Sequence, residues 1–146
     1  MNKWILVLAL ASVLVSCRKQ SDVDRKKMDD YISKNHFTGS YTPEGVFVVI
    51  DVEGQNGHPT VNNTVKVAYT GTLLDGSVFD ATAAGTFIEF PLTQVISGWQ
   101  IGIPKFQKGG KGKLIIPSAL GYGSNNVGSI PSNSVLVFDI NLADWK

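Results

Sequence analysis

The sequence has few of the residues on which most enzyme active sites depend. Among its 146 residues are one cysteine, Cys17, and two histidines, His36 and His58. A single cysteine cannot form an intramolecular disulfide or a four-cysteine zinc or iron–sulfur site, and two distant histidines argue against a histidine-rich metal site. A nucleophilic triad places a base beside its nucleophile, and neither histidine stands in such a context. We therefore expect no metal and no organic cofactor.

An excess of either charge is also missing. Thirteen lysines and arginines against twelve aspartates and glutamates leave a formal net charge of +1. Binding along a nucleic-acid backbone requires a basic surplus, so nucleic acid is not an expected partner. Hydrophobic residues make up 43% of the chain and charged residues 17%, which indicates a folded protein. The length allows one domain of about 100 to 150 residues and a short appendage.

The first seventeen residues, MNKWILVLALASVLVSC, have the pattern of a secretory signal peptide. Their apolar run is too short for a transmembrane helix, which needs about 20 residues; a buried helix is the alternative. Residues 14–17 resemble the bacterial lipobox, in which the cysteine is lipidated and the signal is cut before it. We therefore expect a signal peptide at 1–16 and a lasting lipid anchor on Cys17. The expected location is the cell envelope, at the outer membrane and facing the periplasm.

Residues 17–44 are expected to link this lipidated cysteine to the folded domain. Six basic and four acidic residues are interspersed between 18 and 34, a composition typical of a solvated tether. Ser21 or Asp22 can cap a short helix there, whose apolar residues form only a narrow stripe: Val23, Met28, Tyr31 and Ile32. We interpret the segment as a marginal helix or a flexible spacer in preference to a dimerisation helix, and we expect a monomer.

The expected domain, residues 45–146, shows mainly the period-two pattern of strands. Strands are predicted at 46–50, 64–73, 111–116 and 136–142, and the Asp75–Gly76 dipeptide predicts a tight hairpin turn with a return strand from Val78. One helix is predicted near Ser97, a candidate N-cap, because Trp99 and Ile103 begin an apolar helical stripe. The pattern indicates an α+β fold, with a mostly antiparallel sheet and one short helix on its apolar face.

Four segments of this domain resemble the FKBP-type peptidyl-prolyl isomerases, in the order and close to the spacing found in that family. The segments are VAYTGTLLDGSVFDAT (67–82), QVISGW (94–99), KGGKGKLIIPSALGYG (108–123) and SIPSNSVLVFDINL (129–142). The resemblance covers essentially residues 45–145. It implies a five- or six-stranded antiparallel half-barrel wrapped around one short helix, with an apolar pocket between them. The charged tether behind a lipobox is also similar to lipoprotein members of the family.

The resemblance implies an enzyme that accelerates rotation of Xaa-Pro bonds in exported polypeptides. Trp99 would form the pocket floor, Phe79, Tyr69 and Phe138 its walls, and Tyr122 and the backbone of Ile96 would hydrogen-bond substrate carbonyls. Asp80 would accept a hydrogen bond from Tyr69 and face the twisting amide. The implied catalytic residues are Asp80, Tyr122, Trp99 and Phe79, and the implied substrate-binding residues are Tyr69, Ile88, Val95, Ile96, Val127 and Phe138. Expected ligands are proline-containing polypeptides and macrolides of the rapamycin type.

Two positions depart from the family's pattern. Ile88 stands where an aromatic wall is common, unless a shift of one residue places Phe87 there. The loop after Tyr122 is polar and leaves Val127 as the expected apolar contact. These departures leave open an FKBP-like chaperone or binding module with little turnover. A separate alternative is a structural lipoprotein whose sheet docks a partner.

Overall fold

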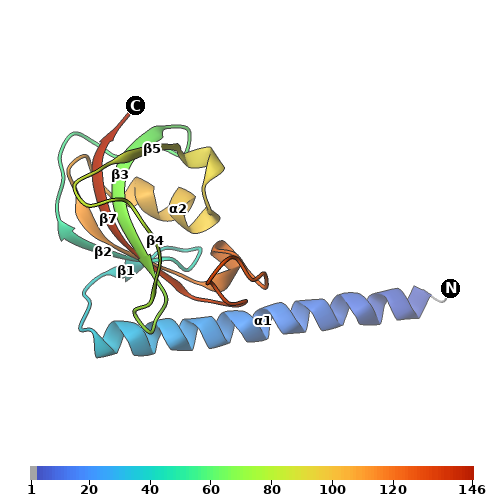
Figure 1. The fold of residues 1–146 in the computed structure, drawn as a ribbon. Helices are drawn as coiled ribbons and strands as arrows, with labels where there is room; N and C mark the ends of the chain where they lie inside the picture. Colours follow the sequence, from blue (N-terminus) through green and yellow to red (C-terminus); the bar gives the residue numbers. More distant parts are fainter. Residues whose placement is uncertain (1–2) are drawn as a thin grey trace.

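The computed structural model describes the backbone of residues 3–146 and the side chains from residue 19 onward. Over this range, a long N-terminal helix lies against a seven-stranded antiparallel sheet that curves around a short helix (Figure 1). The helices are α1 (Lys3–Lys34) and α2 (Ser97–Gly102), with single 3-10 turns η1 (Leu92–Gln94), η2 (Ile103–Lys105) and η3 (Ser118–Leu120). The strands are β1 (Ser40–Tyr41), β2 (Phe47–Val52), β3 (Thr64–Thr72), β4 (Val78–Ala81), β5 (Ile88–Pro91), β6 (Lys111–Ile116) and β7 (Leu136–Trp145). The α+β half-barrel expected from the sequence is confirmed, and the two-residue strand β1 brings the count to seven.

The strand order is β1-β2-β6-β7-β3-β4, and β5 pairs with β3 beyond the end of β4. Strand β3 therefore has two partners along one edge: β4 opposite Thr70–Thr72 and β5 opposite Thr64–Val67. The predicted hairpin between β3 and β4 is confirmed. Gly76 has a φ of +87°, which a glycine adopts without strain, and the Leu73 amide donates to the Ser77 carbonyl at 3.0 Å.

Helix α2 packs on the concave face of the sheet, where two glycines let it approach β6 closely. A Cβ at Gly98 would collide with the Ile116 side chain, and one at Gly102 would lie 2.5 Å from a Leu114 methyl carbon. The prediction that Ser97 is the N-cap was wrong, because the helix begins at Ser97 itself and Ile96 takes the cap position without a side-chain hydrogen bond. Trp99 and Ile103 are buried in the main core, as their spacing predicted.

A second hydrophobic cluster lies on the opposite face of the sheet, beneath α1. Alternate strand residues turn toward it, including Phe47 and Val49 of β2, Ile115 of β6 and Val137 of β7. Met28 of α1 is 1% exposed at this contact. Both faces of the sheet are buried here, which explains why residues 46–50 form an unbroken apolar run.

Residues 18–34, interpreted from the sequence as a flexible spacer or a marginal helix, belong to the continuous helix α1. Its narrow apolar stripe is sufficient because the sheet supplies a matching apolar face. The N-terminal part of α1 extends beyond the domain (Figure 1). The predictions for the signal peptide and Cys17 depend on side chains that lie outside the described residues. Across residues 3–146, no helix combines the length and apolar character needed to cross a membrane.

Candidate active site

A cavity of about 370 Å³ opens between the concave face of the sheet and α2. Its volume lies in the range of roughly 300–1,000 Å³ that is typical of small-molecule sites. Strands β3, β4, β5 and β7, helix α2, the turn before α2 and the loop after η3 contribute side chains to it. The lining residues are Tyr69, Phe79, Asp80, Phe90, Pro91, Gln94, Val95, Ile96, Trp99, Tyr122 and Phe138.

Aromatic rings form the base and walls of this cavity. Trp99 and Phe138 are each 4% exposed and form its buried base. The ring centroids of Tyr69, Phe138 and Phe90 lie 5.1, 5.3 and 5.9 Å from that of Trp99, at interplanar angles of 90°, 84° and 89°. Phe79 stands edge-on to Phe138 at 5.5 Å. Edge-to-face contacts stabilise such clusters, so these rings hold one another in place.

A glycine on β3 makes room for two of these rings. A Cβ at Gly71 would lie 2.6 Å from carbons of the Phe79 ring and 2.9 Å from a carbon of Phe138. These separations are shorter than a normal carbon–carbon contact of about 3.5–4.0 Å. Gly71 therefore determines how closely the Phe79 wall approaches the strand, a role that the sequence pattern gave no reason to assign.

Asp80 and Tyr69 form the polar rim of the cavity. The Tyr69 hydroxyl donates to Asp80 Oδ2 at 2.5 Å, as the family resemblance implied. Burial raises the pKa of the Tyr69 hydroxyl above its ordinary value of 10.0, and the hydrogen bond to the Asp80 carboxylate raises it further. Asp80 is an exposed residue of β4, so its carboxylate stays hydrated while this bond fixes its direction. Tyr69 is therefore a neutral donor at physiological pH.

Two groups at the cavity have hydrogen-bonding capacity to spare. Among the residues whose side chains are described, none bonds to the Tyr122 hydroxyl. The Ile96 carbonyl accepts from the Trp99 and Gln100 amides at 3.0 and 3.2 Å, whereas its own N–H has no acceptor in the same part of the chain. A free hydroxyl and a free amide are suited to bind carbonyl groups of a peptide.

The aromatic wall expected near residue 88 is formed by Phe90. Ile88 pairs with Val67 near the start of β5, is 37% exposed and does not line the cavity, while Phe90 pairs with Val65. Ile88 and the alternative Phe87, which is 39% exposed, therefore both lie outside the cavity lining, contrary to expectation. The register of β5 against β3 decides this placement, and register depends on long-range pairing that a single strand does not reveal.

Val127 also lies outside the cavity lining, contrary to expectation. It forms an isolated bridge with Ile130, in which each amide donates to the other residue's carbonyl at 3.0 and 2.9 Å. This tight turn buries Ile130 in the core and leaves Val127 40% exposed. The other eight predicted site residues all line the cavity. Three further lining residues, Phe90, Pro91 and Gln94, were not predicted from the sequence. Of these three, only Phe90 could have been proposed from the sequence, as an aromatic residue in a strand.

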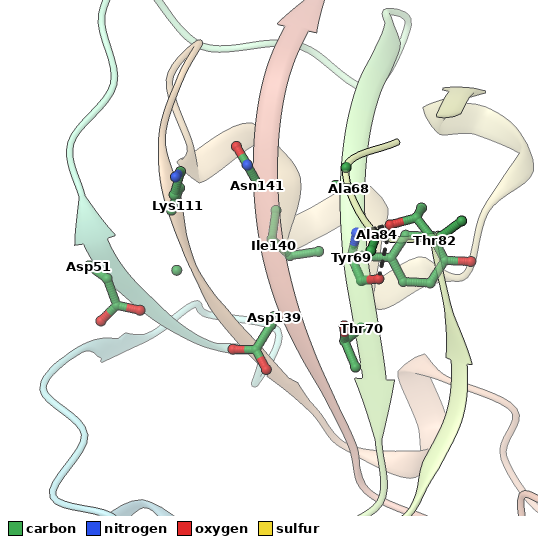
Figure 2. Close-up of a pocket in the computed structure, with 13 residues that line it drawn as sticks. Asp51, Ala68, Tyr69, Thr70, Thr82, Ala84, Lys111, Asp139, Ile140 and Asn141 are labelled. Carbon is green, nitrogen blue, oxygen red and sulfur yellow. Dashed lines mark hydrogen bonds between the residues drawn. The ribbon is translucent and has the colours of Figure 1, made fainter. Parts of the chain in front are cut away.

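A second cavity, of about 380 Å³, lies on the outer face of the sheet (Figure 2). It is bordered by polar side chains such as Asp51, Asp139 and Asn141, and Figure 2 shows the Tyr69 ring directed away from these groups. Asp139 is already paired with Lys113. The aromatic cavity is the better candidate because it combines apolar surface, free donors and a fixed carboxylate.

This arrangement suits the binding of an apolar ring beside a peptide carbonyl, without proton transfer or covalent chemistry. Within the described residues, no three histidine, cysteine, aspartate or glutamate side chains gather in a way that could hold a metal ion. Fold and cavity thus define an antiparallel half-barrel protein with an aromatic cleft between sheet and helix.

The comparisons identify the family within this class. Residues 55–143 match the FKBP-type peptidyl-prolyl cis-trans isomerases, and the chain belongs to that family. It is 39% identical over 127 residues to the FKBP-type isomerase FkpA of Aeromonas hydrophila, covering 85% of this chain and 47% of that protein. The chain spans less than half of the curated FkpA relatives from Buchnera aphidicola, Aeromonas hydrophila and Escherichia coli.

Two crystal structures extend the comparison. FkpA from Escherichia coli superimposes with a TM-score of 0.76 at 31% identity, covering all of this chain and 74% of that one. A peptidyl-prolyl cis-trans isomerase from Pseudomonas syringae superimposes with a TM-score of 0.77 at 29% identity, covering 88% of this chain and 95% of that one.

Proposed function

We propose that this chain catalyses cis–trans isomerisation of Xaa-Pro bonds in exported polypeptides while a lipid on Cys17 holds it at a membrane. The observation that carries the catalytic part is the cavity itself. It places an aromatic base, a free Tyr122 hydroxyl and the fixed Asp80 carboxylate around one space. Membership in the isomerase family supports the same reading.

The chemistry follows from the electronic structure of the amide bond. Rotation breaks the resonance of the planar amide over a barrier of about 20 kcal/mol and takes tens to hundreds of seconds unaided, so roughly 5.5–8 kcal/mol of stabilisation is needed for a 10⁴- to 10⁶-fold acceleration. The twisted amide has less charge separation than the planar one, and a dry aromatic cavity therefore favours it over water.

The cavity residues have separate roles in this scheme. The proline ring rests on Trp99 between the walls formed by Phe79 and Phe90. The Tyr122 hydroxyl and the Ile96 amide hold the carbonyls of the residues on either side of the rotating bond. Asp80, held by Tyr69, faces the amide as it turns. Val95 and Phe138 complete the apolar surface.

The catalytic proposal is tested with the full chain in detergent micelles and a chromogenic Xaa-Pro peptide. We expect the wild type to accelerate exchange and Tyr122→Phe to lower the rate by about three- to tenfold, since one hydrogen bond contributes about 0.5–1.5 kcal/mol. Asp80→Ala should lower it as well. Asp51→Ala and Tyr31→Phe, which alter a carboxylate and a phenol outside the cavity, should keep the wild-type rate.

A folded wild-type chain that leaves the exchange rate unchanged would rule out the catalytic proposal. If such a chain still bound a macrolide of the rapamycin type, the binding-module alternative would replace it. Equal losses in the cavity and control variants would show that the cavity is not the site.

The anchoring proposal is supported by the sequence around Cys17 and by the contacts of α1. Because Asp24 and Met28 are buried against the domain, only a short helical segment separates Cys17 from the first docked residue. At a rise of about 1.5 Å per residue, seven residues span about 10 Å. A lipid on Cys17 would therefore hold the domain close to the bilayer surface. The location we propose for it is the outer membrane, facing the periplasm.

Expression in a Gram-negative host with radiolabelled palmitate tests this anchor. We expect the wild type to incorporate label, to lose residues 1–16 and to sediment with the outer membrane. Cys17→Ser should remain unlabelled and uncleaved, whereas Ser16→Ala should behave as the wild type does. Equal labelling of wild type and Cys17→Ser would exclude a lipid on Cys17.

A further inference from the structure

Helix α1 buries a carboxylate that the proposed chemistry does not use. Asp24 is 1% exposed, although it lies in the middle of a charged helix. Its Oδ2 accepts from the Ser118 backbone amide at 2.8 Å and from the Ser118 hydroxyl at 2.5 Å. Its Oδ1 accepts from Gln20 Nε2 at 2.7 Å. Burial of a carboxylate is costly without such donors, so these bonds specify one position of Asp24 against the domain.

The other acidic residues in this part of α1 behave differently. Asp29 and Asp30 pair with Arg25 and Lys26 at i,i+4 spacing, and their side chains are 53% and 68% exposed. Pairs of this kind contribute little to stability. Asp29 also accepts from the Tyr41 hydroxyl at 2.6 Å, but it stays exposed and Tyr41 follows α1 closely, whereas Asp24 is buried and bonds to a residue 94 positions later in the chain.

Ser118 connects this carboxylate to the active-site loop. Its carbonyl accepts from the Gly121 amide at 3.0 Å and from the Gly123 amide at 2.8 Å. These two glycines are the immediate neighbours of Tyr122, so both sides of the tyrosine are held by one carbonyl. The amide of the same serine donates to Asp24. The Ser118 amide and carbonyl belong to the two peptide units that flank its Cα, so holding the amide and the hydroxyl on Asp24 also fixes the direction of the carbonyl. The contact with α1 therefore reaches the backbone around Tyr122.

We propose that Asp24 is a positioning residue for the isomerase site. It holds Ser118 at the start of η3 and thereby fixes the loop that carries Tyr122. This role rests on the proposed use of the Tyr122 hydroxyl in binding a substrate carbonyl. Displacement of a binding group by a fraction of an ångström is costly for catalysis, because the group is effective only when its geometry is fixed in advance. Helix α1 thus sets part of the active-site geometry from the face of the sheet opposite the cavity.

The test compares the full-length wild type with Asp24→Ala, Asp24→Asn and Ser118→Ala, and uses Asp30→Ala as the matched control. Amide hydrogen exchange at Gly121 and Gly123 reports the loop directly, and amides of β3 and β7 report global stability. In Asp24→Ala we expect exchange at the two glycines to rise by about tenfold and the isomerase rate to fall several-fold, while β3 and β7 stay protected. Asp24→Asn keeps an acceptor oxygen for Ser118 and should recover most of the rate, and Asp30→Ala should match the wild type.

Combining Asp24→Ala with Ser118→Ala should add little to the effect of Asp24→Ala alone, because Asp24→Ala already removes both bonds to Ser118 and Ser118→Ala removes only the hydroxyl bond. The proposal is overturned if Asp24→Ala leaves the exchange of Gly121 and Gly123 at the wild-type value, or raises exchange in β3 and β7 equally. Should Asp24→Ala not fold, Ser118→Ala decides on the same exchange criterion. A wild type without isomerase activity would refute the proposed function, whereas the exchange data would still decide whether Asp24 positions the loop.

Discussion

Tyr69 shows how one residue contributes both to the site and to the stability of the domain. Its ring stands at 90° to Trp99, and its hydroxyl donates to Asp80. Burial and this hydrogen bond raise the pKa of its hydroxyl in the folded protein. In the unfolded chain the hydroxyl titrates near its ordinary value of 10.0. The two states therefore bind different numbers of protons only in alkaline solution.

This difference predicts a loss of stability at high pH. Below about pH 10 Tyr69 is protonated in both states, and its contribution to the free energy of unfolding is fully present. Above that pH the unfolded chain binds fewer protons than the folded one, so the free energy of unfolding falls as pH rises. Urea unfolding at several pH values between 8 and 11.5 should show a steeper fall for the wild type than for Tyr69→Phe. Identical slopes for the two proteins would contradict the prediction.

The family resemblance placed individual residues at the cavity where a local motif was sufficient to align them. Trp99 and Tyr122 lie in motifs that resemble the family, and both line the cavity. Phe90 was missed because the choice between Ile88 and Phe90 depends on the pairing of β5 with β3. Gly71 was missed for a different reason: its importance lies in the space that the Phe79 and Phe138 rings occupy, which the strand pattern does not contain.

At the level of the secondary-structure element, the stability of helix α2 depends on its tertiary contacts. The helix is six residues long, too short to be stable alone in water, and its N-cap carries no side-chain hydrogen bond. Its buried residues instead stabilise it: Trp99 packs in the aromatic cluster, and Gly98 lies against Ile116. The close approach at Gly98 keeps Trp99 at the base of the cavity.

Gly98→Ala should therefore disturb the domain. A methyl group there would lie 2.7 Å from Ile116 Cδ1 and would push α2 away from β6. We expect a loss of about 1–3 kcal/mol in the free energy of unfolding, as for other overpacked cores. Ser97→Ala, at an exposed neighbouring position, should change it by less than about 0.5 kcal/mol. Urea unfolding measures both values. Equal stability of Gly98→Ala and the wild type would show that α2 can shift without cost.

The limits of the strands were easier to predict from the sequence than the burial of the residues within them. The limits of β6 agree with the predicted 111–116, and the Asp75–Gly76 turn is confirmed. The period-two pattern of β7 places Val137 on the same face as the polar Asp139 and Asn141, yet Val137 is 2% exposed. The pattern of one strand shows which residues alternate, but whether the second face is covered depends on another element. Here that element is α1.

For the whole molecule, the docking of α1 joins the N-terminal segment to the domain. Besides Asp24 and Met28, the contact includes Tyr41, whose hydroxyl donates to Asp29 at 2.6 Å and whose ring lies 3.5 Å below the Arg25 guanidinium carbon. The apolar part of the contact is the cluster around Met28. We infer that α1 from about residue 20 onward unfolds together with the domain.

Met28→Ala tests this cooperative unit. Removal of a fully buried methionine side chain should cost about 2–5 kcal/mol, because apolar contacts are lost and a cavity remains. Val23→Ala, at a position on the same helix that is 40% exposed, should cost less than about 0.5 kcal/mol. Chemical unfolding of residues 17–146, followed by tryptophan fluorescence, reports the domain, because the two tryptophans of this segment, Trp99 and Trp145, both lie after α1. A cost below 1 kcal/mol for Met28→Ala would show that α1 is not part of the unit.

The amino-acid sequence alone determined the class of fold, the main strands, the β3–β4 turn and most of the residues around the cavity. The strands and the turn follow from local chemistry, namely the alternation of apolar side chains and a glycine that accepts a positive φ. The cavity residues followed from the resemblance of four segments to the isomerase family. Tertiary structure decided the rest. Only the folded chain shows that Phe90 forms the wall, that α1 covers the second face of the sheet and that Asp24 reaches Ser118. Each of these depends on register or on contacts between distant residues, and the period of one segment cannot specify either.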